Sequence, residues 1–262
     1  MQKPTSSTLF TGHHLIELDE VDSTNTYALQ LLSQNQDDLT LLPEGTLITA
    51  NQQHSGRGQR GSGWKSEPGK NLTLSFIFYP QFIAAEKAFL LSQAISLGVY
   101  DFVKGELGAG TSIKWPNDIY FRDLKIAGIL IENQIRSTRI QTMVAGIGIN
   151  VNQAAFPADL PNASSFTIVK EESFDLKVCI QKLSICIEAR YLALKSGTTQ
   201  SIQEDYHKAL FRLGEFHRYN IEGTIILAKI IGLSPEGKLM LEMVDGKRSA
   251  YGNKEVQFVI GK

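Results

Sequence analysis

Short blocks of hydrophobic residues in the first half of the chain predict strands, and a longer periodic block predicts a helix. Residues 15–18 and 47–50 are short apolar runs, and residues 72–79 alternate between large apolar and other side chains until Pro80 ends the run. Residues 89–103 carry apolar side chains at three- and four-residue steps, which is the spacing of an amphipathic helix. The pattern therefore begins as strands interleaved with helices.

Polar residues mark the start of an earlier helix and a long interruption between two strands. Residues 22–25, Asp-Ser-Thr-Asn, are N-cap candidates because the apolar residues that follow, from Tyr27 to Leu32, have helical spacing. Residues 51–70 are polar, rich in glycine and arginine, and without a hydrophobic period. We expect a long loop there, and loops of this length inside a compact domain are usually functional or mobile.

The middle of the chain favours strands again. β-rich segments lie around Ile113 and over residues 125–135 and 140–151. Residues 126–131 are apolar on both faces, as expected of a strand in the centre of a sheet. These segments predict the main part of a buried sheet.

The last third of the chain changes from helices to short strands. Helical spacing over residues 176–194 and 202–210 predicts two helices, and Gly214 is a candidate stop. Turn signals then separate three predicted strands, at residues 223–231, 239–244 and 251–260. We therefore expect a large domain over residues 1–213 and a small β domain, of barrel type, over residues 214–262.

Composition and charge narrow the classes of function. The chain has 262 residues, of which 42% are hydrophobic and 20% charged. These values are close to the average of globular proteins, so a sizeable core can be buried. The formal net charge is −1, which provides no global basic field to hold nucleic acid or an anionic membrane. Any site for an anion must therefore be local.

Cysteine use and the N-terminus favour a cytoplasmic protein. Cys179 and Cys186 lie two turns apart on one predicted helix, about 10 Å along its axis, which is too far for a disulfide. We expect two free core cysteines in a reducing compartment. Residues 1–10 are polar and lack the design of a signal peptide. No apolar run approaches the length of about 18 residues that a membrane span requires.

The strongest candidate for chemistry is the loop sequence Gly-Arg-Gly-Gln-Arg-Gly at residues 56–61, followed by Trp64. Glycines let backbone N–H groups converge on one point, and the guanidinium groups of Arg57 and Arg60 suit phosphate or carboxylate. The alternative is a flexible arginine–glycine loop, including one that touches RNA. The segment is not a P-loop, because no Gly-Lys-Ser/Thr follows at the required spacing.

A second candidate is Lys-Trp-Pro-Asn-Asp at residues 114–118. The proline fixes a bend and sets Asn117 and Asp118 side by side at a strand end. Such oxygen ligands suit Mg²⁺, which prefers one or two carboxylates together with substrate phosphate. An ordinary Pro-Asn-Asp turn is the alternative. The 5 histidines show no metal-ligand spacing, and we assign them no ligand role.

Two glycine-containing segments carry the remaining candidates. Lys125 begins a buried apolar strand, where a charge is costly unless an anion meets it; a surface lysine just before the strand is the alternative. Gly128 within that strand indicates close approach by backbone or ligand. Residues 146–152, Gly-Ile-Gly-Ile-Asn-Val-Asn, have Val151 where a dinucleotide fingerprint needs a third glycine. A Rossmann site is therefore not expected.

In their order and spacing, these motifs together resemble those of the biotin protein ligases. The motifs are Ser23-Thr24-Asn25, residues 56–64, residues 114–118, Lys-Ile-Ala-Gly-Ile-Leu at residues 125–130 and Gly-Ile-Gly-Ile-Asn at residues 146–150. The resemblance covers about residues 15–151 and continues more weakly to the C-terminus. It implies an α+β fold with a mixed β-sheet flanked by helices, related to class II aminoacyl-tRNA synthetases, and a small C-terminal SH3-like β-barrel.

The resemblance also implies an activity and a partner. Family members make biotinyl-5′-adenylate from biotin and ATP with Mg²⁺, and transfer biotin to one lysine of a carrier domain in a carboxylase. We therefore expect a biotin carboxyl carrier protein as the partner, and a monomer or homodimer. Some members also carry an N-terminal helix-turn-helix. Here 22 residues precede Ser23, too few for a three-helix DNA reader, so no DNA binding is expected.

Matching motif positions assign expected roles to single residues. Biotin is expected to contact Ser23, Thr24, Asn25, Gln53, Gly128 and Leu130. The carboxylate and phosphate are expected at Gly56, Arg57, Gly58 and Lys125, and the binding set also includes Gln59, Arg60, Lys114, Gly146 and Gly148. Positions near the adenylate and Mg²⁺ are Asn117, Asp118 and Asn150, with Asp118 as metal ligand. Trp64 is expected to pack over the ligand once the loop closes. The expected catalytic residues are Lys125, Arg57 and Asp118.

One departure from the family pattern concerns the loop. Many members carry arginine where Gln59 and Ser62 stand, so the positive charge around the phosphate is weaker in this chain. We expect either a different closing contact or a looser hold on the adenylate, and Arg60 is a candidate to compensate.

Two other functions are compatible with parts of the sequence. A lipoate or octanoate ligase or transferase on a related fold would need a long apolar slot. A nucleotide- or RNA-binding module that used Arg57 and Arg60 would show salt-dependent affinity for RNA, which the near-neutral charge disfavours.

Overall fold

A mixed seven-stranded sheet forms the centre of the protein. The computed structural model describes residues 8–35, 39–61 and 63–260. The strand order is β1-β2-β3-β7-β6-β5-β4; β1 and β2 pair in parallel and the other neighbours are antiparallel. The bounds are β1 Leu15–Val21, β2 Thr46–Gln53, β3 Leu72–Phe78, β4 Thr111–Lys114, β5 Asp118–Phe121, β6 Leu124–Arg136 and β7 Arg139–Ile149.

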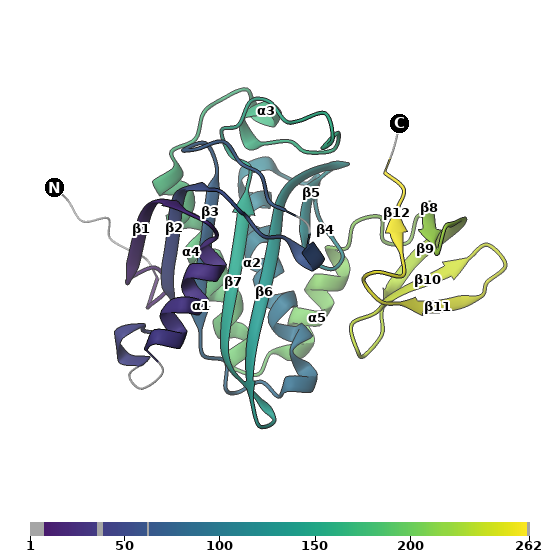
Figure 1. The fold of residues 1–262 in the computed structure, drawn as a ribbon. Helices are drawn as coiled ribbons and strands as arrows, with labels where there is room; N and C mark the ends of the chain where they lie inside the picture. The colour runs from purple at the N-terminus through teal and green to yellow at the C-terminus, as the bar shows by residue number, and fades with distance from the viewer. Residues whose placement is uncertain (1–7, 36–38, 62, 261–262) are drawn as a thin grey trace.

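Helices cover both faces of this sheet, as Figure 1 shows with α1 in front and α2 and α4 behind. The helices are α1 Thr24–Gln34, α2 Phe89–Leu107, α3 Phe166–Lys170, α4 Leu176–Lys195 and α5 Thr199–Lys208. A large hydrophobic core lies between the sheet and α2 and α4. A smaller core beneath α1 contains Ala28, Leu32, Leu42, Ile48, Ile77 and Val144. The fold is therefore α+β with a helix-flanked mixed sheet, as expected.

A second, smaller sheet follows α5 and lies beside the β4–β5 edge (Figure 1). Its order is β11-β10-β9-β8-β12, and every pair is antiparallel. The bounds are β8 Phe216–Ile221, β9 Thr224–Leu233, β10 Leu239–Met243, β11 Arg248–Tyr251 and β12 Gln257–Phe258. Because β11 and β12 are the two edges of this order, closure into an SH3-like barrel stays a prediction, as does the boundary after residue 213.

Most predicted elements are confirmed, and the differences have physical reasons. The predicted single strand over residues 251–260 was wrong, because β11 ends at Tyr251 and β12 contains two residues after a turn. The sequence did not predict β5, β8 or α3. β5 and α3 have only four and five residues, too few for a clear period. All seven residues of β3 are buried, despite the alternation in size, because helices cover both of its faces.

Two further expectations concern cysteines and membranes. Cys179 and Cys186 are both on α4 and both free, and burial raises the pKa of the Cys179 thiol to about 11. Within the described ranges, no helix combines the length and apolar character that a bilayer span requires.

Candidate active site

Glycines hollow out the face of the sheet on which α1 lies. One row of paired residues crosses five strands as Lys114, Asp118, Gly128, Gly148 and Thr73. Directly paired residues point to the same face, so the two glycines leave a gap between Thr73 and the charged pair. A Cβ at Gly148 would overlap the Trp64 indole. Because Gly128 and Gly148 carry no side chains, this row leaves the space that Trp64 enters.

The next row supplies the polar end of the same hollow. Leu130, Gly146 and Ser75 pair across β6, β7 and β3, and a Cβ at Gly146 would overlap the Asn25 amide. Asn25 comes from the first turn of α1, which begins at the edge of the hollow. The resulting cavity has a volume of about 360 Å³.

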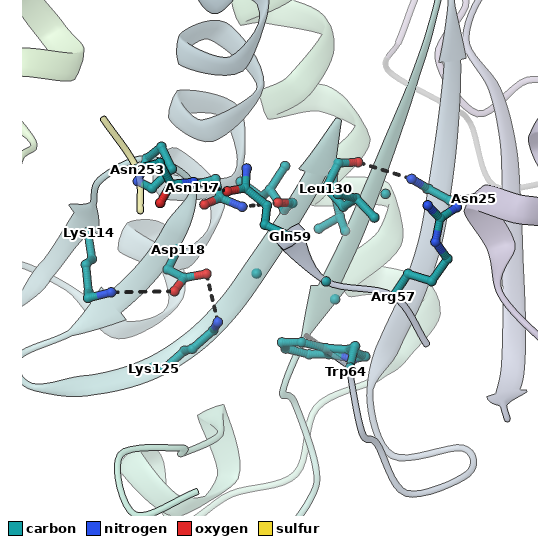
Figure 2. Close-up of a pocket in the computed structure, with 18 of the residues that line it drawn as sticks. Asn25, Arg57, Gln59, Trp64, Lys114, Asn117, Asp118, Lys125, Leu130 and Asn253 are labelled. Carbon is teal, nitrogen blue, oxygen red and sulfur yellow. Dashed lines mark hydrogen bonds and ion pairs between the residues drawn. The ribbon is translucent and has the colours of Figure 1, made fainter. Parts of the chain in front are cut away.

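The cavity brings together most of the residues that the sequence nominated. These are Ser23, Thr24, Asn25, Gln53, Arg57, Gly58, Gln59, Trp64, Lys114, Asn117, Asp118, Lys125, Gly128, Leu130, Gly146 and Gly148. Figure 2 shows the labelled members arriving from α1, the loop, the β4–β5 turn and β6. Segments separated by a hundred residues thus converge on one site.

Within the described part of the chain, Gly56 and Asn150 are the nominated binding residues that are not among those lining the cavity. The Gly56 carbonyl accepts a hydrogen bond from the Trp64 N–H at 2.8 Å, and a Cβ at Gly56 would overlap the Trp64 backbone. Asn150 is 3% exposed, and its Nδ2 donates to the Ser164 carbonyl at 2.9 Å. The expected direct contacts of Gly56 and Asn150 with ligand stay predictions. The Arg60 side chain and Ser62 lie outside the described residues.

Lys125 and Asp118 form an ion pair at one end of the cavity. Lys125 Nζ lies 2.8 Å from Asp118 Oδ1, and Lys114 Nζ lies 4.0 Å from Oδ2. Figure 2 shows both lysines directed at Asp118 from different sides. The anion that a lysine at the start of a buried strand requires is therefore this carboxylate.

Lys114 occupies a more enclosed position than Lys125. Burial lowers the pKa of the Lys114 ammonium; Asp118 opposes the shift, and Lys125 and Arg212 add to it. Its Nζ also lies 4.8 Å from the centroid of the Phe258 ring. An anion placed beside Lys114 would favour the charged form of this lysine.

Arg57 is held at the opposite end of the cavity. Its NH1 and NH2 groups donate to the two oxygens of Glu132 at 3.2 and 2.9 Å. Asn25 Nδ2 donates to the same carboxylate at 2.9 Å. Sequence reasoning missed Glu132, because a glutamate near the end of a predicted strand resembles an ordinary solvated position.

Trp64 lies directly against the sheet. Its ring is the nearest neighbour of both Gly128 and Gly148, and Lys125 Nζ is 5.9 Å from its ring centroid. The indole N–H is buried without a hydrogen-bond partner in the described part of the chain. The loop tryptophan therefore covers the glycine hollow, which is the surface that a flat ligand would need.

The C-terminal sheet completes one wall of the cavity. Asn253 Nδ2 donates to Gln59 Oε1 at 2.6 Å, and the Trp115 indole N–H donates to the Gly237 carbonyl at 3.0 Å. The wall also contains Val256, Gln257 and Phe258. None of these C-terminal residues was nominated, because they belong to no recognisable motif.

The side chains do not form a site that holds a metal ion by themselves. The described residues contain no group of three or more His, Cys, Asp or Glu side chains placed to hold a metal. Among those that line the cavity, Asp118 is the one carboxylate, and Lys125 and Lys114 face its oxygens. A resident Mg²⁺ ligated by protein groups alone does not fit this donor set.

Comparisons with known proteins agree on one family. The Biotin/lipoate A/B protein ligase family matches residues 18–150. The bifunctional ligase/repressor BirA of Bacillus spizizenii is 32% identical over 243 residues, which are 92% of this chain and 73% of that protein. The biotin–[acetyl-CoA-carboxylase] ligase of Mycobacterium tuberculosis is 28% identical and covers 87% of this chain and 84% of its own length.

A solved structure is similar over almost the whole chain. The biotin protein ligase from Aquifex aeolicus in complex with biotin and ATP superposes with a TM-score of 0.77 and 26% identity, covering 95% of this chain and 100% of the other. The likeness therefore includes the small C-terminal sheet as well as the helix-flanked one.

Proposed function

This chain belongs to the biotin/lipoate A/B protein ligase family, and we propose that it activates biotin with ATP to biotinyl-5′-adenylate and then transfers the biotin to a lysine of a carrier domain. The observation that carries the proposal is that two cationic side chains line the same glycine-lined cavity. Arg57 and Lys125 lie at different ends of this hollow, so one elongated anionic ligand can meet both.

In the first reaction, a biotin carboxylate oxygen attacks the α-phosphorus of ATP, and the bond to pyrophosphate breaks. Two anions must approach each other, so their mutual repulsion is the first obstacle. Lys125 and Arg57 offset this repulsion and stabilise charge that develops on the phosphate. Alignment of both reactants in one cavity supplies much of the remaining acceleration. No side-chain nucleophile is required.

Mg²⁺ enters this proposal with the nucleotide, as part of the substrate. Mg²⁺ is usually bound through one or two carboxylates together with substrate phosphates. Asp118 is the candidate protein ligand, because an incoming phosphate offers Lys125 an alternative anionic partner. Up to this point the proposal assigns Asp118 two successive roles, first as partner of Lys125 and then beside the metal–phosphate complex.

In the second reaction, the carrier lysine attacks the carbonyl carbon of the adenylate and AMP leaves. The free pKa of a lysine is about 10.4, so its ammonium must lose a proton before it attacks. Asp118 is the candidate proton acceptor, because its carboxylate lines the cavity. Asn117 is placed next to it by a hydrogen bond from its Nδ2 to the Ile129 carbonyl.

The adenylate is a reactive mixed anhydride, so water must be excluded until the carrier arrives. Residues 56–64 close on themselves through the pairing of Arg57 with Gly63 and carry Trp64 onto the sheet. We assign Trp64 the role of a lid. Its ring moves off the glycine surface when the ligand binds and then packs over the ligand. The monomer or homodimer state, the cytoplasmic location and the absence of DNA binding stay predictions.

A single assay tests the proposal. The purified protein is incubated with labelled biotin, ATP, Mg²⁺ and a purified biotin carrier domain, with parallel reactions that omit ATP or replace biotin by lipoate. We expect ATP-dependent label on one lysine of the carrier and none from lipoate. Label from lipoate but not from biotin would overturn the proposal, as would pyrophosphate release that does not depend on biotin.

A further inference from the structure

A continuous chain of hydrogen bonds lies at the polar end of the cavity, and three of its members, Thr24, Asn25 and Gln53, line the cavity. The Thr24 N–H donates to Gln53 Oε1 at 2.8 Å, and the Ser75 hydroxyl lies 2.8 Å from Thr24 Oγ1 and 2.6 Å from Asn25 Oδ1. The chain then continues through Asn25 Nδ2 to Glu132 Oε2 at 2.9 Å. Five side chains from four separate elements are therefore linked into one network.

The Glu132 carboxylate sets the direction in which this chain donates. A carboxylate only accepts hydrogen bonds, so Asn25 must turn its Nδ2 toward Glu132 and its Oδ1 toward Ser75. The Leu130 carbonyl oxygen lies 3.2 Å from the same Nδ2, and it too can only accept a hydrogen bond, so it favours the same orientation of the amide. Asn25 is thus held in one of its two amide orientations.

The orientation of Asn25 fixes the hydroxyl protons in turn. Ser75 has one hydroxyl proton, and it must go to Asn25 Oδ1. The contact between Ser75 and Thr24 then requires the Thr24 hydroxyl proton. Gln53 Oε1 is left with the Thr24 N–H, which is closer to it, at 2.8 Å, than the Thr24 hydroxyl oxygen at 3.2 Å.

This direction defines what the cavity wall offers a ligand. Thr24 Oγ1 has given its proton to Ser75, so it can accept a hydrogen bond from the ligand. Gln53 has used Oε1, so its Nε2 is a donor. An adjacent acceptor and donor fit a neutral group with both N–H and C=O, which is the chemistry of a cyclic urea such as the ureido ring of biotin.

The same carboxylate also holds Arg57. Both guanidinium nitrogens bind Glu132 in a bidentate pair, and the Glu132 side chain is 24% exposed. A ligand carboxylate or phosphate binds an arginine through the same fork of donors. An anionic ligand must therefore compete with Glu132 for Arg57, whereas a neutral ligand does not.

We propose that Glu132 is a positioning residue that orients Asn25, and through it Ser75, Thr24 and Gln53, for recognition of the neutral ring of the ligand. The inference rests on the proposed function, because it takes biotin as the ligand. The inference predicts different effects on two ligands. Loss of the Glu132 charge lowers the affinity for a carboxyl-free analogue more than the affinity for biotin, because the released Arg57 becomes available to the biotin carboxylate.

The test compares biotin with biotinol, in which an alcohol replaces the carboxylate, by calorimetry on the full chain. Glu132→Gln keeps the size of the side chain but removes the charged acceptor of Asn25 Nδ2, so the Leu130 carbonyl alone is left to fix the orientation of the amide. We expect biotinol to bind about tenfold more weakly, the size of one hydrogen bond to a charged group, and biotin to lose distinctly less. The matched control is Glu20→Gln, which neutralises a carboxylate paired with His54 outside the cavity.

A double-mutant cycle separates positioning from a general structural effect. In an Asn25→Ala background, Glu132→Gln should cause little further loss of biotinol affinity, because its effect passes through Asn25. Equal losses for both ligands, or full additivity with Asn25→Ala, would overturn the inference. If Glu132→Gln does not fold, Glu132→Ala serves the same comparison, because it also removes the carboxylate that binds Asn25 and Arg57. Failure of the wild-type protein to bind either ligand would instead count against the proposed function.

Discussion

Asn253, in the turn between β11 and β12, donates a hydrogen bond of 2.6 Å to Gln59 of the glycine-rich loop, although the two residues are 194 positions apart. Gln59 stands where many biotin protein ligases carry arginine. The sequence predicted either a different closing contact or a looser hold on the adenylate. In the structure the uncharged Gln59 side chain accepts a hydrogen bond from the turn between β11 and β12, and its part in closing the loop stays a prediction.

We predict that this contact helps to hold the nucleotide. Gln59→Ala and Asn253→Ala should each raise KM for ATP by about two- to tenfold, the size of one hydrogen bond of about 0.5–1.5 kcal/mol. The double variant should be no worse than either single variant, because both remove the same bond. Steady-state kinetics with varied ATP measure this, with Gln200→Ala on the surface of α5 as control. Additive losses would mean that the two side chains act separately.

Lys125 is predicted to be necessary for adenylate formation. Lys125→Ala should lower the rate of biotin-dependent pyrophosphate release by about a hundredfold or more, the usual scale for loss of one group that stabilises transition-state charge. Lys65→Ala is the matched control, because Lys65 forms an exposed pair with Asp159 outside the cavity. Unchanged pyrophosphate release in a folded Lys125→Ala protein would remove Lys125 from the mechanism.

Arg57 is predicted to retain the adenylate rather than only to help form it. Arg57→Gly should let biotinyl-adenylate leave the enzyme faster, because the variant removes the cation and loosens the loop that carries Trp64. The ratio of free to enzyme-bound adenylate, measured after rapid filtration, should rise severalfold. Arg122→Gly is the control, at an arginine outside the cavity with a φ of 57° that glycine tolerates. A wild-type ratio would show that the loop is not a lid.

The sequence predicted the residues of the cavity better than their partners. Lys125, Asp118 and the glycines of β6 and β7 were found because short motifs mark them. Glu132 was not found, since its partners Asn25 and Arg57 precede it by 107 and 75 positions. Such contacts depend on strand order, and the hydrophobic period of one strand does not say which strand lies beside it.

The C-terminal wall was missed for a related reason. Asn253 lies in a turn between β11 and β12, where no motif and no period mark it. The sequence predicted one strand over residues 251–260, which would have placed Asn253 inside a sheet. The turn instead carries it toward Gln59, so the error in the element also concealed the contact.

Gly148 is predicted to be essential for seating of Trp64. A methyl group in Gly148→Ala would overlap the indole, so Trp64 should leave the sheet and become more exposed. Tryptophan emission should shift to the red and biotin affinity should fall. Gly105→Ala on α2 is the control, because an added Cβ there meets no atom within 4 Å. Unchanged emission would contradict the packing of Trp64 on this glycine. The other of the 2 tryptophans, Trp115, is buried and its indole N–H is hydrogen-bonded. A red shift of the emission is therefore assigned to Trp64.

Lys114 is predicted to take up a proton when the nucleotide binds at alkaline pH. Burial lowers its pKa, so part of the Lys114 population is neutral at a pH somewhat below the usual lysine value of about 10.4. Phosphate oxygens beside Lys114 favour the ammonium form and therefore raise its pKa. Binding then draws a proton from solution, and ATP affinity should decrease as the pH rises through the lowered pKa.

Calorimetry at alkaline pH below the usual lysine pKa of about 10.4, in two buffers with different ionisation enthalpies, measures this uptake. Lys114→Met keeps the length of the side chain but cannot be protonated, so the dependence on buffer should disappear. Lys238→Met is the matched control, because Lys238 lies in the turn before β10 and does not line the cavity. If Lys114→Met takes up as many protons as the wild-type protein, the proton goes elsewhere, and Lys114 does not meet the phosphates.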